Sequence, residues 1–151
     1  MTNPLDSNGS ARQRVLFVCT GNTCRSVFAE YLGRQLFGDA VLLESAGIRP
    51  QRAEDAENAI YTLRKNFNID ASSHLPRDVR TLDLGKYSLI IALEKSAAKV
   101  VVGLGAPASK VKLWKIHDPW GADLVEYDRA SLEIKKKLVQ LKRSGDGGGG
   151  V

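Results

Sequence analysis

The chain of 151 residues is 43% hydrophobic and 26% charged, with a formal net charge of +5 at pH 7. This composition is ordinary for one globular domain that buries its own core. Because the first dozen residues are polar and no apolar run approaches the ~20 residues of a membrane span, the sequence predicts neither a secretory signal nor a membrane segment, and we expect a cytoplasmic protein.

Short apolar runs alternate with stretches of helical periodicity along the chain, a pattern typical of alternating strands and helices. The expected strands, of which the last is an edge strand, cover residues 15–19, 40–44, 88–93 and 111–116. The expected helices cover residues 26–37, 53–67, 95–104 and 124–141. We expect a single domain over residues 14–143. A flexible N-terminal segment, residues 1–13, should precede it, and a flexible glycine-rich tail, residues 144–151, should follow it.

Repeated strand–helix units imply an α/β fold in which right-handed crossovers join parallel strands. We expect a four-stranded parallel sheet in the flavodoxin-like order 2-1-3-4, with helices on both faces. Ligands of such sheets bind beyond the carboxyl ends of the strands, at the point where the strand order reverses. The loop that follows the first strand lies at this edge, so it is the first place to search for a site.

This loop reads Cys19-Thr20-Gly21-Asn22-Thr23-Cys24-Arg25-Ser26. A tight turn between a strand and a helix N-terminus gathers backbone N–H groups and partial positive charge into a cradle for an anion. A cysteine at the floor of the cradle should be a thiolate near neutral pH, and a guanidinium fork can hold two oxygens of a tetrahedral anion. The loop therefore predicts attack of the Cys19 sulfur on phosphorus, with Arg25 clamping the equatorial oxygens.

Other residues of the loop have supporting roles. Ser26 fits two compatible roles, as the N-cap of the helix and as a hydrogen-bond donor to the thiolate. Gly21 and Asn22 both tolerate a positive φ and give the turn its backbone freedom. Cys24 is either a packing residue or a redox partner of Cys19, because the sequence alone specifies no S–S geometry.

The remaining chemistry of the chain argues against metals and nucleic acids. Both cysteines lie in one loop, which excludes a structural disulfide framework. His74 and His117 show no zinc-ligand spacing relative to the cysteines, so we predict no metal site. Much of the basic excess falls at residues 135–137 and 142–143, which we interpret as a solvated helix face rather than a nucleic-acid surface.

A leaving alkoxide or phenolate needs a proton, so a general acid must accompany the cysteine. The best candidate is Asp118, which follows the last expected strand and should emerge at the same edge of the sheet as Cys19. Pro119 restricts Asp118 to an extended conformation and stiffens its loop. His117 is the rival proton donor.

Motif order and spacing over residues 15–141 make the chain resemble the low-molecular-weight protein tyrosine phosphatases. The most specific features are the Cys-x5-Arg-Ser loop and the Asp-Pro pair about a hundred residues later. Weaker matches are the segments 44–47 and 73–77. The resemblance implies that Ser45 and His74 support the cradle through hydrogen bonds to Asn22.

The resemblance also implies a reaction in two steps. Cys19 takes the phosphoryl group while Asp118 protonates the leaving group, and Asp118 then activates a water that hydrolyses the phosphocysteine. The family needs no metal or cofactor. We expect phosphorylated proteins as substrates, inorganic phosphate or other oxyanions as ligands, no nucleic-acid or membrane partner, and a monomer or weak dimer.

Several residues depart from the usual pattern of the family. Val27 replaces a Pro, and Glu94 stands where many members have Asp, with no role assigned. Trp120 replaces the Tyr that often follows Asp-Pro and can wall the cleft or anchor its loop. We expect Ile48 and Arg49 to form the opposite rim.

Thr23 bears on the substrate. Many tyrosine-specific members carry a bulkier apolar residue there, whereas Thr resembles the bacterial branch that hydrolyses phosphoarginine in proteins. We place phosphotyrosine first and phosphoarginine second.

Thioredoxin-coupled arsenate reductases share the fold but need further cysteines, which this chain lacks outside the loop. A non-catalytic phosphate-binding module is disfavoured by the intact Cys, Arg, Ser and Asp set.

Overall fold

The computed structural model describes residues 12–146. The expected flexible ends fall largely on residues outside this range, so for residues 1–11 and 147–151 that expectation stays a prediction. The first strand begins at Gln13 and the last helix extends to Asp146. No helix among the described residues is both long and apolar enough to cross a membrane.

Four parallel strands form the sheet, and they are β1 (Gln13–Cys19), β2 (Val41–Gly47), β3 (Leu89–Ala92) and β4 (Val111–Leu113). Their spatial order is β2-β1-β3-β4, which confirms the predicted α/β fold and strand order. Cys19 lies opposite Gly47 of β2, and Val18 lies opposite Ala92 of β3. The carboxyl ends of these three strands therefore meet at one edge of the sheet.

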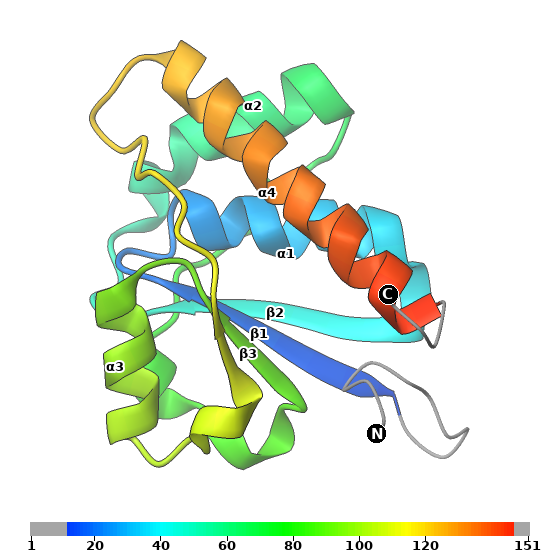
Figure 1. Ribbon diagram of the computed structural model, residues 1–151. Helices are drawn as coiled ribbons and strands as arrows, with labels where there is room; N and C mark the ends of the chain where they lie inside the picture. The colour runs from blue at the N-terminus through cyan, green and yellow to red at the C-terminus, as the bar shows by residue number, and fades with distance from the viewer. Residues whose placement is uncertain (1–11, 147–151) are drawn as a thin grey trace.

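Helices cover both faces of the sheet, as Figure 1 shows. One face carries α1 (Arg25–Phe37), α2 (Glu57–Phe67) and α4 (Leu124–Asp146), and the other carries α3 (Lys95–Gly103). Side chains alternate along a strand, so β1 packs Val15 and Phe17 against α1, α2 and α4 on one face. It packs Leu16 and Val18 against α3 on the other face. Burial on both faces explains why β1 reads as a continuous apolar run.

The expected strand over residues 111–116 is too long, because β4 ends at Leu113. Its partner β3 ends at Ala92, so regular pairing has no strand left to follow. The backbone still follows this edge, with Trp114 N donating to Ala92 O at 2.8 Å and Ile116 N to Leu93 O at 3.3 Å. These two bonds hold residues 114–116 beside the carboxyl end of β3, which is the edge of the sheet where β1 also ends.

Candidate active site

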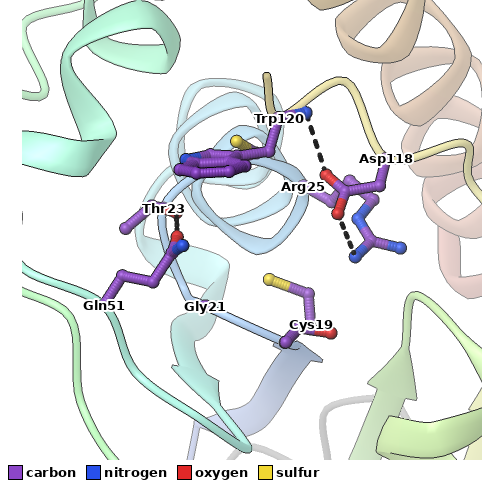
Figure 2. A pocket seen from close by; sticks show the side chains of 9 residues that line it. Cys19, Gly21, Thr23, Arg25, Gln51, Asp118 and Trp120 are labelled. Carbon is purple, nitrogen blue, oxygen red and sulfur yellow. Dashed lines mark hydrogen bonds and ion pairs between the residues drawn. The ribbon is translucent and has the colours of Figure 1, made fainter. Parts of the chain in front are cut away.

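A pocket of about 210 Å³ opens at the carboxyl end of β1, where the loop after Cys19 leads into α1 (Figure 2). Its lining comes from the loop, from the segment after β2 and from the loop before α4. The lining residues are Cys19, Thr20, Gly21, Thr23, Cys24, Arg25, Gln51, Asp118 and Trp120. The fold thus gathers the sequence-predicted nucleophile, cationic clamp and general acid around one cavity.

Asn22 holds the curled shape of the loop. Its backbone has φ 57°, the left-handed region that Asn tolerates better than most residues. Its buried side chain donates from Nδ2 to Ser26 Oγ at 2.8 Å and to Ser45 Oγ at 2.9 Å. Its Oδ1 accepts from the Arg77 N–H at 3.0 Å, and its carbonyl oxygen lies 2.8 Å from His74 Nε2. Ser45 and His74 therefore stand where the resemblance places them.

The segment after β2 braces the loop from the side. Ile48 N donates to Cys19 O at 3.0 Å and Arg49 N to Thr20 O at 2.8 Å, which extends the pairing of β1 with β2 past the strand ends. Gly47 permits this approach, because a Cβ there would lie 2.6 Å from Thr20 O. The backbone of the loop is thus hydrogen-bonded on its outer side as well as through Asn22.

The Cys19 sulfur is nearly buried and lies 3.0 Å from Ser26 Oγ. Since Ser26 Oγ already accepts from Asn22 Nδ2, its own hydrogen is free to point at the sulfur. Ser26 is the second residue of α1, and the N-cap position belongs to Cys24. Of the two roles considered for Ser26, the geometry favours donation to a thiolate and does not support capping.

Arg25 is buried and held on several sides. Its Nη1 donates to the carbonyl oxygens of Leu93 and Ile116, the latter at 3.2 Å. Its Nη2 lies 2.6 Å from Glu94 Oε1 and 3.3 Å from Asp118 Oδ2. The buried Nε has no hydrogen-bond partner among the described residues. An unpaired guanidinium N–H is costly inside a protein. Arg25 lines the pocket, so its guanidinium is a candidate partner for an oxyanion there.

Asp118 lines the pocket wall across from Thr23 and Gln51 (Figure 2). One carboxylate oxygen accepts from the Trp120 N–H at 3.1 Å, and the other faces Arg25. The side chain is 48% exposed, so water and a leaving group can both reach it. His117, the rival donor, is outside the lining and lies 3.9 Å from Glu126 instead.

Cys24 is a packing residue in this structure. It is almost fully buried in the core beside α4, and its thiol donates to the Tyr127 hydroxyl at 3.6 Å. Burial raises the pKa of the Cys24 thiol to about 12, and burial likewise raises the pKa of Tyr127. A thiol that stays protonated at neutral pH is a poor nucleophile, which argues against a redox role of Cys24. The redox role itself stays a prediction.

Glu94, for which the sequence suggested no role, contacts the loop directly. Thr20 Oγ1 and Arg25 Nη2 both donate to its Oε1, and Ser96 Oγ donates to its Oε2 at 2.8 Å. Burial of the carboxyl group works against ionisation, but the hydrogen bonds from Thr20 and Ser96 and the charge of Arg25 outweigh it, so the pKa of Glu94 lies below its ordinary value. Its position directly after the third strand was the available signal.

The rim differs from the expected one. Trp120 lines the pocket and is 51% exposed. Ile48, expected on the opposite rim, is instead buried in the core beside α3, and Arg49 is exposed outside the lining. Gln51 takes their place, and its Oε1 accepts a hydrogen bond from Thr23 Oγ1. Sequence reasoning missed Gln51 because no local pattern shows which side chain of an irregular segment turns inward.

The chain is similar to a family of phosphatases and to a curated arsenate reductase. The sequence model of the low molecular weight phosphotyrosine protein phosphatases matches residues 14–144. An arsenate reductase of Staphylococcus epidermidis is 30% identical over 131 residues, which are 87% of this chain and 97% of that protein.

Two solved structures are similar along nearly their whole length. A low molecular weight protein tyrosine phosphatase from T. tengcongensis has a TM-score of 0.78 and 31% identity, covering 87% of this chain and 99% of that one. An arginine phosphatase from Geobacillus stearothermophilus has a TM-score of 0.76 and 26% identity, covering 89% of this chain and 92% of that one.

Proposed function

The chain belongs to the low molecular weight phosphotyrosine protein phosphatase family, and we propose that it hydrolyses phosphotyrosine in proteins through a phosphocysteine intermediate. The observation that carries this proposal is the meeting of Cys19, Arg25 and Asp118 at one pocket, with Ser26 Oγ 3.0 Å from the sulfur. A nucleophile, a clamp for oxyanions and a proton donor are the three parts that such a reaction needs.

In the first step the Cys19 thiolate attacks phosphorus. The S–P bond forms while the bond from phosphorus to the tyrosine oxygen breaks, and the protonated Asp118 carboxyl gives its proton to that oxygen. Backbone N–H groups of the loop and the Arg25 guanidinium balance the charge on the three equatorial oxygens. Positioning and electrostatics supply the acceleration, as in other phosphoryl transfers.

In the second step a water attacks the phosphocysteine. Asp118, now a carboxylate, takes a proton from the water as the O–P bond forms and the S–P bond breaks. The electron pair of that bond returns to sulfur, where the Ser26 hydroxyl stabilises the departing thiolate. The products are inorganic phosphate and the starting form of the enzyme. Apart from the substrate and one water, the residues of the protein supply every group that these two steps use.

The aromatic wall of the pocket supports phosphotyrosine. Trp120 projects over the pocket beside Asp118 and is half exposed, so part of its ring is available for contact with a substrate ring (Figure 2). Offset contact between two aromatic rings is favourable beyond the area that it buries.

Phosphoarginine in proteins is the second candidate, favoured by the polar wall of Thr23 and Gln51. Their oxygens can accept from the N–H groups of a substrate guanidinium, which a purely apolar wall cannot do. The similarity to an arginine phosphatase adds support. Replacing Thr23 by Ile should lower phosphoarginine turnover and spare phosphotyrosine turnover if this wall selects the substrate.

Arsenate reduction, the activity named for the Staphylococcus relative, fits this chain less well. Such a cycle needs a second reactive thiol to release Cys19 from the arsenic adduct. The chain has two cysteines, and the other one, Cys24, has its pKa raised to about 12 by burial. We therefore expect no oxidation of thioredoxin that depends on arsenate.

One substrate panel tests the proposal. Wild type, Cys19→Ser and Cys24→Ser are assayed on an aryl phosphate, a phosphotyrosine peptide, a phosphoarginine protein, and arsenate with thioredoxin. We expect turnover of the aryl phosphate and the phosphotyrosine peptide that disappears in Cys19→Ser and persists in part in Cys24→Ser. Full activity of Cys19→Ser, or turnover of arsenate alone, would refute the proposal.

A further inference from the structure

Glu94 connects the two ends of the phosphate-binding loop. One of its carboxylate oxygens accepts from Thr20, directly after the nucleophile, and from Arg25, the clamp at the start of α1. The second oxygen accepts from Ser96 in the first turn of α3. A single side chain, two residues beyond the end of β3 at the N-cap of α3, thereby links the loop to the helix on the opposite face of the sheet.

Two carboxylates share one nitrogen of Arg25, but they are held differently. Glu94 is the closer, at 2.6 Å from Nη2, and its side chain is 26% exposed with both oxygens engaged. Asp118 lies 3.3 Å away and is 48% exposed, and its other oxygen accepts from the Trp120 N–H of its own loop. Glu94 is therefore the fixed partner of Arg25, and Asp118 is the partner that can leave.

We propose that Glu94 is a positioning residue that holds Arg25 and Thr20 in the orientation required by the transferring phosphoryl group, so that Asp118 is free to move protons. This inference rests on the proposed phosphatase function. Glu94 acts through Arg25 and Thr20 and is not among the residues that line the pocket. Its role is to keep the guanidinium fork aimed while the bonds to phosphorus change.

This role predicts an unusual combination of effects. Removing the Glu94 charge loosens Arg25, and a small misplacement of a catalytic group lowers turnover strongly. The same change removes a negative charge next to the site of an oxyanion, so phosphate binding in the ground state should not weaken. Loss of kcat with an unchanged or lower KM indicates an interaction that matters in the transition state.

The experiment compares wild type with Glu94→Gln, Glu94→Asp and the control Glu133→Gln, which removes the same charge from an exposed position of α4. The readouts are kcat and KM for an aryl phosphate, the Kd of inorganic phosphate, and the melting temperature. In Glu94→Gln we expect kcat to fall by about 10²-fold while KM and Kd stay equal or decrease. Glu94→Asp should recover part of kcat because it keeps the charge, and Glu133→Gln should behave as wild type.

Other outcomes would overturn the inference. A kcat of Glu94→Gln equal to or above that of wild type would mean that Glu94 merely competes for Arg25. A parallel loss of kcat, phosphate affinity and melting temperature, without recovery in Glu94→Asp, would mean a purely structural role. If wild type binds phosphate but hydrolyses no substrate, the proposed function fails by itself, and weaker phosphate binding by Glu94→Gln would then refute the inference separately.

Discussion

The two segments that meet at the pocket, the Cys19 loop and the loop over residues 117–123, are held to very different degrees. In the Cys19 loop the side chains of Asn22, Arg25 and Ser26 are buried. Asn22 donates to Ser45 of β2, Arg25 donates to Glu94 at the N-cap of α3, and backbone carbonyls of the loop accept from the segment after β2. In the other loop Asp118 and Trp120 are about half exposed, and the Trp120 N–H donates to Asp118 within the loop itself.

This difference matches the tasks that the proposed reaction gives to the two segments. Donors that stabilise charge in a transition state work best when they are already in place, because no reorganisation is needed during the reaction. A general acid must instead change its protonation state and its partners twice in each cycle. In the proposed reaction the firmly held Cys19 loop binds the anion, and the lightly held loop over residues 117–123 transfers protons.

In the firmly held Cys19 loop, the largest loss of kcat is expected from Arg25→Lys. A lysine keeps the positive charge but cannot reproduce the fork that Arg25 extends to Leu93, Glu94 and Ile116. We expect kcat for an aryl phosphate to fall by about 10³-fold. Arg52→Lys, at an exposed position, serves as the control, and a kcat of Arg25→Lys within tenfold of wild type would contradict the role of the fork.

The corresponding change on the lightly held side is Asp118→Asn. Because Asn cannot transfer the proton, we expect kcat to fall by about 10²-fold with a phenolate leaving group. The loss should be smaller with a nitrophenolate, which departs without protonation. His117→Asn is the matched control, and equal losses for both leaving groups would show that Asp118 is not the acid.

The rigidity of the Cys19 loop is tested by Asn22→Ala. This change removes three hydrogen bonds of a buried side chain and leaves Ala at φ 57°. We expect the free energy of unfolding to fall by about 3 kcal/mol. A drop in kcat, smaller than that of Asp118→Asn, should accompany it.

Asn68→Ala is the control, since Asn68 has φ 55° at the end of α2 and takes no part in the pocket. It should lower stability by about 1 kcal/mol and leave kcat unchanged. Equal kcat in both variants would show that the contacts of Asn22 do not shape the cradle.

The smallest effect is expected from Trp120→Ala. Loss of one aromatic contact should raise KM for a phosphotyrosine peptide roughly fivefold, with little change in kcat. Trp120→Phe should restore most of the affinity. An unchanged KM would assign Trp120 to anchoring its own loop and would weaken the case for phosphotyrosine over phosphoarginine.

The sequence predicted what local patterns encode. The helices, the four strands and the Cys19 loop follow from periodicity and from the spacing of Cys19 and Arg25, and the rule for carboxyl ends of parallel strands brought Asp118 to the same edge. The length of β4 depended on where its neighbour β3 stops, which no window of residues 111–116 contains.

The rim and the supporting contacts depended on tertiary pairing. Ile48 turns into the core and Gln51 turns toward the pocket because the segment after β2 pairs with the Cys19 loop. Cys24 became a packing residue through Tyr127, a residue 103 positions away. The partners of Glu94 likewise come from both sides of the sheet, so its role required the assembled fold.

The most direct test of the central claim is to trap the covalent intermediate. Asp118→Asn is mixed with an aryl phosphate carrying radiolabelled phosphorus, quenched within one turnover and digested. The account predicts label on the peptide that contains Cys19 and none in the Cys19→Ser, Asp118→Asn double variant. Turnover without any labelled protein, or label on a peptide other than that of Cys19, would contradict it.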